Sequence, residues 1–172
     1  MTDVNIRQAT SADAAALHAL VSEHMTEGHL LPRSLADLTR HASRFVVCEA
    51  GGAIAACAEL APLSRRVAEV RSLVVSSSFR RSGLAAGVVE ALTVRARAAG
   101  FETVCAFTHD ARFFLKHNFS IVPHQSLPEK ISTDCVSCPL FGACGQLAMI
   151  LPLEAAADGV ARPAVVRRKR VA

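Results

Sequence analysis

The chain between Glu69 and Gly87 reads EVRSLVV-SSSF-RRSGLAAG, and this stretch indicates the fold more clearly than any other. Its first seven residues are mostly apolar or β-branched and predict a strand, in which Glu69, Arg71 and Leu73 alternate to one face. Three serines then end the strand pattern. The small residues after them lead into a helical pattern, so a strand passes through a tight turn directly into a helix.

The turn before this helix is suited to binding a phosphate group. Apolar residues recur every four positions from Gly83 to Ala99, which predicts an amphipathic helix. The first turn of a helix leaves backbone N–H groups unpaired and carries the positive end of the helix dipole, so a pyrophosphate can dock where side chains are small. The spacing fits neither the dinucleotide pattern G-x-G-x-x-G nor the Walker pattern. The candidate contacts are Arg80, Arg81, Ser82, Gly83, Leu84 and Ala85.

These six residues have the form R-x-x-G-x-A and resemble the acyl-CoA loop of the GNAT N-acetyltransferase superfamily. An ordinary strand-to-helix turn is the alternative for so short a match. The resemblance implies acetyl-CoA as co-substrate, with its pantetheine paired along the strand edge. It also implies that a backbone N–H of Leu73, Val74 or Val75 polarises the thioester carbonyl.

Length and composition indicate one globular domain. The 172 residues are 51% hydrophobic and 20% charged, which excludes disorder as the main state. The formal charge of +4 matches the basic run at 167–170, so the domain itself is not expected to bind nucleic acid. Residues 1–5 lack a signal-peptide pattern, and no apolar run reaches the ~18 residues of a membrane span. We therefore expect a cytoplasmic protein whose six cysteines form no disulfides.

Periodicity and turn residues predict the remaining elements. Gly28 ends the first helix, and Gly51-Gly52 joins two strands as a hairpin. The order β-α-α-β-β-β-α-β-α-β-β indicates one α/β domain over 1–153, followed by a mobile basic tail over 154–172. It is also the GNAT order, which implies a central, mostly antiparallel sheet flanked by helices. Strands are expected at 5–9, 45–49, 53–60, 69–75, 103–107, 119–122 and 147–151, and helices at 12–27, 35–41, 83–99 and 111–116.

Three further stretches resemble one branch of this superfamily, the short-form amino-acid N-acetyltransferases of the N-acetylglutamate synthase type, which lack an amino-acid-kinase domain. Residues 28–34 read GHLLPRS, residues 68–75 read AEVRSLVV, and residues 127–144 contain LPEK and DCVSCPLFGAC. The chain departs from the pattern at Gly145-Gln146, where these enzymes usually carry an acidic pair.

The resemblance implies an enzyme that acetylates the α-amino group of L-glutamate or L-glutamine, the first step of arginine biosynthesis. Two alternatives are kept. Either the acceptor is another amine, such as a protein N-terminus or a small molecule, or the domain binds acetyl-CoA as a regulatory module without turnover. GNAT domains often pair through their last strands, so the resemblance also allows a homodimer.

Acetyl transfer needs a base and a proton for the departing thiolate. Glu69 matches the catalytic glutamate of these synthases, which implies that it takes the amine proton through a water. The alternative for Glu69 is an exposed charge at a strand end. Many GNAT enzymes protonate the thiolate with a tyrosine, but the chain has no Tyr, and Phe114 stands at that cofactor-contacting position. Thr108 is the candidate donor and His109 another, although a thiol of pKa ~8.5 also leaves unprotonated at modest cost.

An amino-acid acceptor also requires groups that bind its carboxylates. Arginine suits this role because its guanidinium donates two parallel hydrogen bonds. The candidate substrate contacts are Arg33, Arg71, Ser72 and Lys130. The alternative for each cation is that it is a solvated surface charge. Arg44 or Arg112 could then bind the carboxylate in its place.

Cysteines fall into two groups. Cys48, Cys57 and Cys105 lie inside strand patterns and are predicted to be small core residues. The second group, Cys135, Cys138 and Cys144, has a C-x-x-C spacing with a third cysteine nearby. A zinc site usually has four ligands, so we expect no metal and keep a metal site at these cysteines as the alternative.

Overall fold

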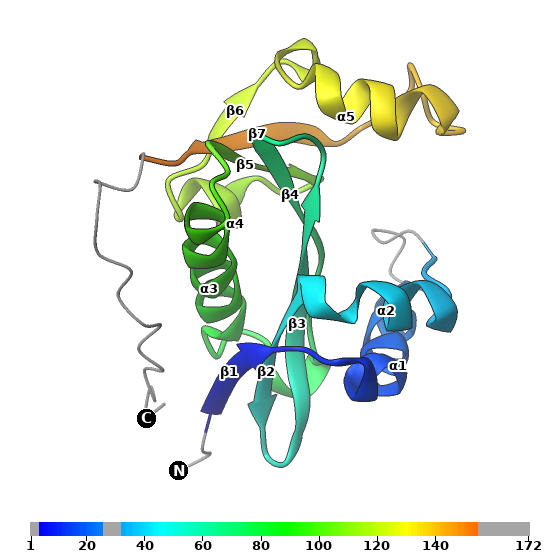
Figure 1. The fold of residues 1–172 in the computed structure, drawn as a ribbon, viewed down its shortest axis with the longest axis vertical. Helices are drawn as coiled ribbons and strands as arrows, with labels where there is room; N and C mark the ends of the chain where they lie inside the picture. Colours follow the sequence, from blue (N-terminus) through cyan, green and yellow to red (C-terminus); the bar gives the residue numbers. More distant parts are fainter. Residues whose placement is uncertain (1–3, 26–31, 155–172) are drawn as a thin grey trace.

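The computed structural model describes residues 4–25 and 32–154 (Figure 1). The predicted order of elements is confirmed within these ranges, and a short helix, α5, is added between the expected strands at 119–122 and 147–151. Predictions for the end of the first helix at Glu27 and Gly28, and for the tail over 155–172, lie outside the described residues. The elements are β1 (Val4–Gln8), α1 (Ala14–Met25), α2 (Leu35–His41), β2 (Phe45–Ala50), β3 (Ala53–Pro62), β4 (Val67–Val75), α3 (Leu84–Ala98), β5 (Thr103–Thr108), α4 (Arg112–Leu115), β6 (Ser120–Val122), α5 (Pro128–Thr133) and β7 (Leu147–Pro152).

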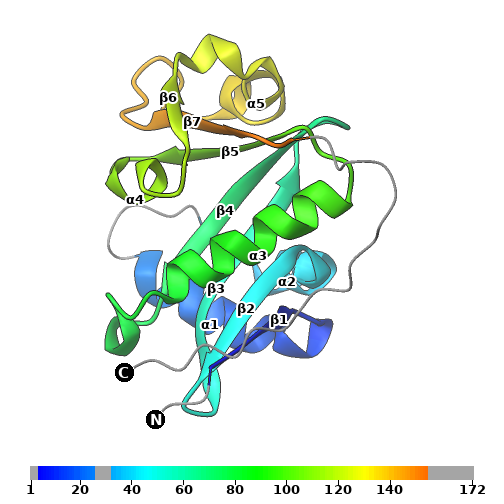
Figure 2. The same cartoon turned by 90° about the vertical axis from the view of Figure 1, so that its left-hand side faces the viewer.

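The strands form one mixed sheet in the order β1-β2-β3-β4-β5-β7-β6. Only the pair β4–β5 is parallel among these neighbours, so the expected mostly antiparallel α/β sheet is confirmed. Helix α3 crosses one face of the sheet, and α1 and α2 cover the other (Figures 1 and 2). The predicted hairpin is also present, because Ala50 pairs with Ala53 across Gly51 and Gly52, which both have positive φ.

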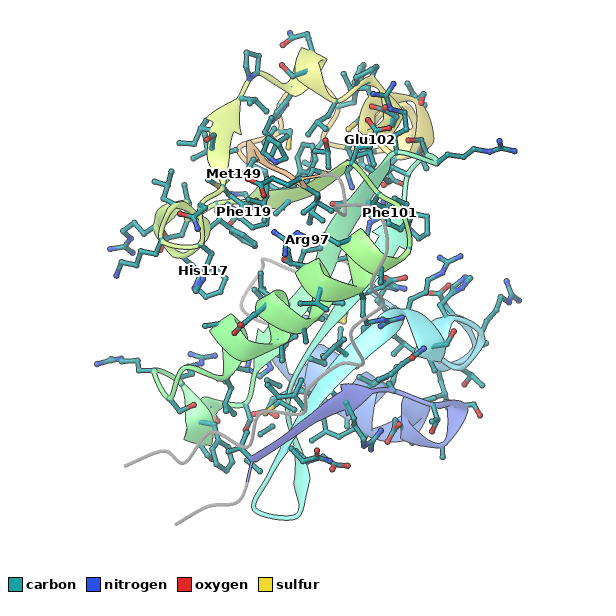
Figure 3. All side chains as sticks on the ribbon, turned by 60° about the vertical axis from the view of Figure 1, so that its left-hand side comes forward. Arg97, Phe101, Glu102, His117, Phe119 and Met149 are labelled. Carbon is teal, nitrogen blue, oxygen red and sulfur yellow. The ribbon has the colours of Figure 1, made fainter. Side chains whose placement is uncertain are left out.

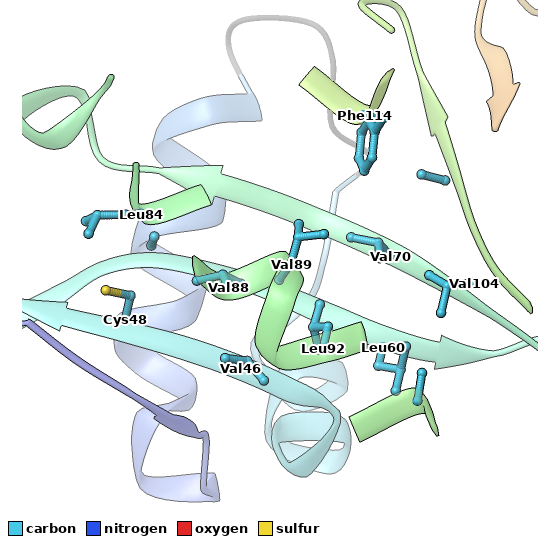
Figure 4. Packing of buried hydrophobic residues seen from close by; sticks show 14 of the residues in the cluster. Val46, Cys48, Leu60, Val70, Leu84, Val88, Val89, Leu92, Val104 and Phe114 are labelled. Atoms are coloured by element: carbon cyan, nitrogen blue, oxygen red, sulfur yellow. The ribbon is translucent and has the colours of Figure 1, made fainter. Parts of the chain in front are cut away.

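The main core lies between α3 and the sheet (Figure 4). The predicted apolar stripe of α3 is confirmed, since Leu84, Val88 and Leu92 are all buried there. Gly87 lets α3 approach β1, because a Cβ at this position would lie 2.7 Å from Cδ1 of Ile6. Gly87 therefore serves close packing between a helix and a strand.

A β-bulge changes the predicted alternation in β4. Cys57 pairs with Val74 but Glu59 pairs with Arg71, so β4 carries one extra residue in this interval. Ser72 takes up the bend with a φ of 49°. The expectation that Leu73 shares a face with Glu69 and Arg71 was wrong. Leu73 packs into the α3 core with Val70, because one inserted residue reverses the face on which the later residues of the strand lie.

Strands β4 and β5 separate within the sheet. Their pairing runs from Val67 opposite Thr103 to Val70 opposite Ala106 and then stops. From Arg71 to Val75, the edge of β4 that faces β5 has no strand partner among the described residues. The two strands therefore diverge, and their divergence opens the molecule at its centre.

Beyond this opening, β5, β7 and β6 form the second part of the sheet, with α4 and α5 beside it (Figure 2). Phe114 of α4 stacks edge-on against Phe119 at 5.1 Å between ring centroids. Phe119 and Met149 are both buried and belong to the same core (Figure 3). This packing fixes β5 and α4 on the far wall of the opening.

Candidate active site

A cavity of about 930 Å³ lies where β4 and β5 separate. Its walls come from α1, α2, β3, β4, β5, α4 and α5, together with residues close to these elements. The sequence-predicted residues that line it are Arg33, Glu69, Arg71, Ser72, Leu73, Val74, Val75, Arg80, Thr108, Phe114 and Lys130. The fold therefore brings together residues from widely separated parts of the chain.

Glu69 stands at the centre of a cluster of four charges. It is 4% exposed, which rules out the alternative of an exposed strand-end charge. Lys130 Nζ lies 3.0 and 2.9 Å from its two carboxylate oxygens, and Arg71 Nε lies 2.6 Å from Oε2. Asp134 accepts hydrogen bonds from both cations, from Lys130 Nζ at 2.9 Å and from the Arg71 guanidinium.

The charges in this cluster compensate one another. Burial alone would lower the pKa of Arg71, but the carboxylates of Glu69, Asp134 and Glu59 together outweigh it and raise that pKa. Lys130 Nζ also lies 5.1 Å from the centroid of the Phe107 ring, a cation–π contact. Arg71 and Lys130 are thus charged groups held in fixed positions around the candidate base.

Arg33 forms a second charge cluster in the cavity wall. Its Nε donates to Asp37 at 2.7 Å, and its Nη1 donates to Glu59 at 2.8 Å. Ser72 Oγ lies 3.4 Å from the same Nη1, and Arg44 Nη1 lies 3.7 Å from the other oxygen of Glu59. Burial would lower the pKa of Arg33, but the two carboxylates raise it. Arg33 is therefore held in the cavity wall as a cation, and is not the solvated surface charge of the alternative.

The candidate proton donors lie at the end of β5. The Thr108 hydroxyl lies 3.0 Å from the carbonyl of Asp110 and accepts from its N–H at 3.1 Å, so the hydroxyl is engaged in a local turn. His109 also lines the cavity. Phe114 lines it as well and is 6% exposed, which is consistent with a contact surface but supplies no proton.

The candidate phosphate loop lies between β4 and α3. Gly83 precedes the helix with a φ of 83°, a left-handed conformation that glycine adopts without strain. The N–H groups of Leu84, Ala85 and Ala86 make no backbone hydrogen bond within residues 4–25 and 32–154. Arg80 lines the cavity, whereas the predicted contacts from Arg81 to Ala85 do not. The Leu84 side chain is buried in the core, so only its backbone can meet a ligand.

The family model for the acetyltransferase (GNAT) family matches residues 14–119. The chain belongs to the GNAT family. An uncharacterised N-acetyltransferase of Chlorobaculum tepidum is 30% identical to this GNAT chain over 151 residues, which is 88% of the chain and 97% of that protein. An amino-acid acetyltransferase of Azotobacter vinelandii is 32% identical over 125 residues, or 72% of the chain, and the chain spans only 29% of it.

Among solved structures, N-acetylglutamate synthase of Neisseria gonorrhoeae, complexed with coenzyme A and N-acetyl-glutamate, superposes with a TM-score of 0.78. The sequence identity is 26%, and the match covers 88% of the GNAT chain and 35% of the synthase. No helix in the described part of the GNAT chain is long and apolar enough to span a membrane.

The two groups of cysteines differ in burial. Cys48, Cys57 and Cys105 are fully buried, as predicted, and burial raises the pKa of the Cys57 thiol to about 12. Cys135 and Cys138 are partly exposed and Cys144 is exposed. Within residues 4–25 and 32–154, no group of three or more His, Cys, Asp or Glu side chains is arranged to hold a metal ion. The alternative of a metal site at these three cysteines thus gains no support.

Several lining residues were missed in the sequence. Glu59 and Asp37 read as ordinary polar positions of a strand and a helix, and Asp134 read only as a neighbour of cysteines. His24, buried in α1 with Nδ1 2.9 Å from the Leu20 carbonyl, carried no motif. The four-residue spacings of Lys130 with Asp134 and of Arg33 with Asp37 were available signals, because residues four apart can meet along a helix. Of the two arginines named as substitute carboxylate-binding residues, Arg44 lines the cavity and Arg112 does not.

Proposed function

We propose that this GNAT chain is an acetyl-CoA-dependent amino-acid N-acetyltransferase, which acetylates the α-amino group of L-glutamate or L-glutamine as the first step of arginine biosynthesis. The observation that carries the proposal is the buried Glu69 carboxylate, held by Lys130 and Arg71 at the point where β4 loses its partner strand. The names of the Azotobacter and Neisseria relatives support the same class of acceptor.

Acetyl-CoA lies along the free edge of β4 in this proposal. Its pantetheine pairs with backbone groups between Arg71 and Val75, and its pyrophosphate meets the N–H groups of Leu84, Ala85 and Ala86 at the start of α3. A backbone N–H of Leu73, Val74 or Val75 polarises the thioester carbonyl, as a fixed donor that needs no reorganisation.

The amine of the acceptor attacks the carbonyl carbon of the thioester. The new C–N bond forms, the C–S bond breaks, and CoA leaves as a thiolate. Both oxygens of Glu69 already accept hydrogen bonds from cations, so Glu69 takes the amine proton through a bridging water. The thiolate takes its proton from solvent or from Thr108, whose hydroxyl must first leave Asp110.

The acceptor binds between the two charge clusters. The α-carboxylate is bound by Arg33, whose Nη2 makes no hydrogen bond with the described residues. Ser72, in the bulge, lies beside it. Arg71 and Lys130 hold Glu69 in place and line the acceptor's other side.

One observation favours a second candidate, an acetyl-CoA-binding module without turnover: Phe114 supplies no proton, and the Thr108 hydroxyl is already engaged. The variant Glu69→Gln separates the two functions. An enzyme should lose about 10²- to 10⁴-fold in kcat while its affinity for acetyl-CoA stays the same. The matched control is Glu49→Gln, in β2, where Glu49 pairs with Arg7 outside the cavity. A wild-type protein that binds acetyl-CoA but acetylates no amino acid would contradict the proposal.

A further inference from the structure

Glu59 is a buried carboxylate that the catalytic proposal does not use. It lies in β3 opposite Arg71, lines the cavity, and its side chain is 2% exposed. A carboxylate so far from water is stable only when cations and hydrogen-bond donors compensate it. Arg33 and Arg44 do so from one side, at 2.8 and 3.7 Å. Glu59 also contributes to the raised pKa of Arg71 on the other side.

Glu59 determines how much of the Arg33 charge is available to a ligand. Two of the three guanidinium nitrogens already donate to protein carboxylates, Nη1 to Glu59 and Nε to Asp37. The remaining nitrogen, Nη2, has N–H groups for one further carboxylate oxygen. Arg33 can thus bind a single further carboxylate. Glu59 and Asp37 already compensate most of its positive charge.

The same balance extends over the whole acceptor end of the cavity. This end carries four cations, and each is ion-paired to a carboxylate in the described part of the chain. The carboxylates also number four, so the formal charges of these Arg, Lys, Asp and Glu side chains cancel, and His41 lies 3.6 Å from Asp37. Its cations are Arg33, Arg44, Arg71 and Lys130, and its anions are Asp37, Glu59, Glu69 and Asp134.

We propose that Glu59 is a specificity-determining residue, which neutralises the acceptor end and selects amino acids with an uncharged side chain over those with a side-chain carboxylate. The inference rests on the proposed amino-acid acetyltransferase function. A zwitterionic acceptor places its carboxylate on Arg33 Nη2 and adds no net charge. A second carboxylate on the acceptor would find the four cations already ion-paired, and the like charges of Glu59 and Asp37 would repel it.

The first test compares L-glutamine with L-glutamate, which differ only by an amide and a carboxylate. We expect kcat/KM of the wild-type protein to be at least about tenfold higher for glutamine. In Glu59→Gln this preference should fall by about tenfold, mainly through a lower KM for glutamate, because the Arg33 charge is no longer compensated by Glu59. The control Glu49→Gln should leave the preference unchanged. A wild-type preference for glutamate, or an unchanged ratio in Glu59→Gln, would overturn the inference.

A second test does not depend on turnover. Glutarate and glutaramate have the same length and differ by one carboxylate, and calorimetry gives the Kd of each in the presence of CoA. Glu59→Gln should bind glutarate about tenfold more tightly relative to glutaramate than the wild-type protein does. If no amino acid is acetylated, the proposed function fails, and this ratio alone then decides the role of Glu59. An unchanged ratio overturns it.

Should Glu59→Gln fail to fold, Asp37→Asn removes the other carboxylate from Arg33. The Asp37 side chain is 37% exposed, so the fold should tolerate this change. It should shift both ratios in the same direction by a smaller factor, because solvent screens Asp37 more than it screens Glu59. No shift with Asp37→Asn would also count against the inference.

Discussion

Lys130 Nζ lies 3.0 and 2.9 Å from the two carboxylate oxygens of Glu69, although 61 residues separate them in the chain. This contact joins the start of α5 to the middle of the sheet across the opening between β4 and β5. The same ammonium reaches Asp134 at 2.9 Å, one helical turn further on. The short helix α5 is therefore tied to the candidate base by charge.

The first prediction concerns the ion pair between Lys130 and Glu69. Lys130→Ala should lower the free energy of unfolding by about 1–3 kcal/mol, because hydrogen bonds to a buried carboxylate are lost. Chemical denaturation measures the change. Lys116→Ala, which removes an exposed lysine, serves as the control and should have little effect. Equal stability of the two variants would show that the contact does not stabilise the fold.

A second prediction concerns the packing of α3 on β1. Gly87→Ala should destabilise the protein by less than about 1 kcal/mol, because Cδ1 at the flexible end of Ile6 must move away from the new methyl group while alanine's higher helix propensity offsets part of that cost. Ile6→Val removes that carbon, so the double variant should recover part of the loss. Thermal unfolding of both single variants and the double variant gives the coupling. Strict additivity of the two changes would argue against the close approach.

A third prediction concerns the thiols. In the native state, a thiol reagent should modify Cys135, Cys138 and Cys144, and the three buried cysteines should react only after denaturation. Burial raises the pKa of Cys105 to about 12 and of Cys48 to about 11, from 9.0. Below pH ~9 these thiols are protonated in both the folded and the unfolded state and do not affect the free energy of unfolding. That free energy should decline as the pH rises from there towards 12, because the thiols then ionise more readily in the unfolded state. Rapid labelling of all six at pH 8 would contradict this assignment.

A fourth prediction concerns acid stability. Arg7 donates to both oxygens of Asp13 at 2.8 Å and holds the pKa of that carboxyl well below its usual range. Because the pKa is lowered on folding, the stabilisation is present above pH ~4 and is lost as the pH falls further. Asp13→Asn should cost about 1 kcal/mol at pH 7, since solvent screens the partly exposed pair. The difference in the free energy of unfolding from wild type should shrink below pH 3. A difference that stays constant with pH would refute the dependence of stability on the ionisation of Asp13.

The order of elements could be predicted because it depends on local patterns. The apolar period of α3, the glycines of the hairpin and the Ser34 cap of α2, which accepts from the Asp37 N–H at 3.1 Å, are all local signals. The bulge at Ser72 was not predictable, because it arises from the pairing of two strands. Helix α5 was missed since six residues beginning with Pro128 give too short a period.

The candidate site could be predicted only in part. Glu69, Arg33 and Lys130 were found through resemblance to a family, and the structure places them around one cavity. Their partners were missed because an ion pair such as Arg33–Glu59 depends on how distant segments are placed, and neither residue type nor spacing reveals it. Thr108 shows the converse, since its hydroxyl is engaged by Asp110 in a contact that no motif indicated.

Release of free CoA thiol on mixing the protein with acetyl-CoA and each of the twenty amino acids is the sharpest test of the proposed function. Glu69→Gln runs in parallel to show that any release depends on the candidate base. We expect release with glutamine or glutamate, and its loss in the variant. Release only with amino acids other than these two, or no release from a protein that acetyl-CoA stabilises against heat, would refute the proposed function.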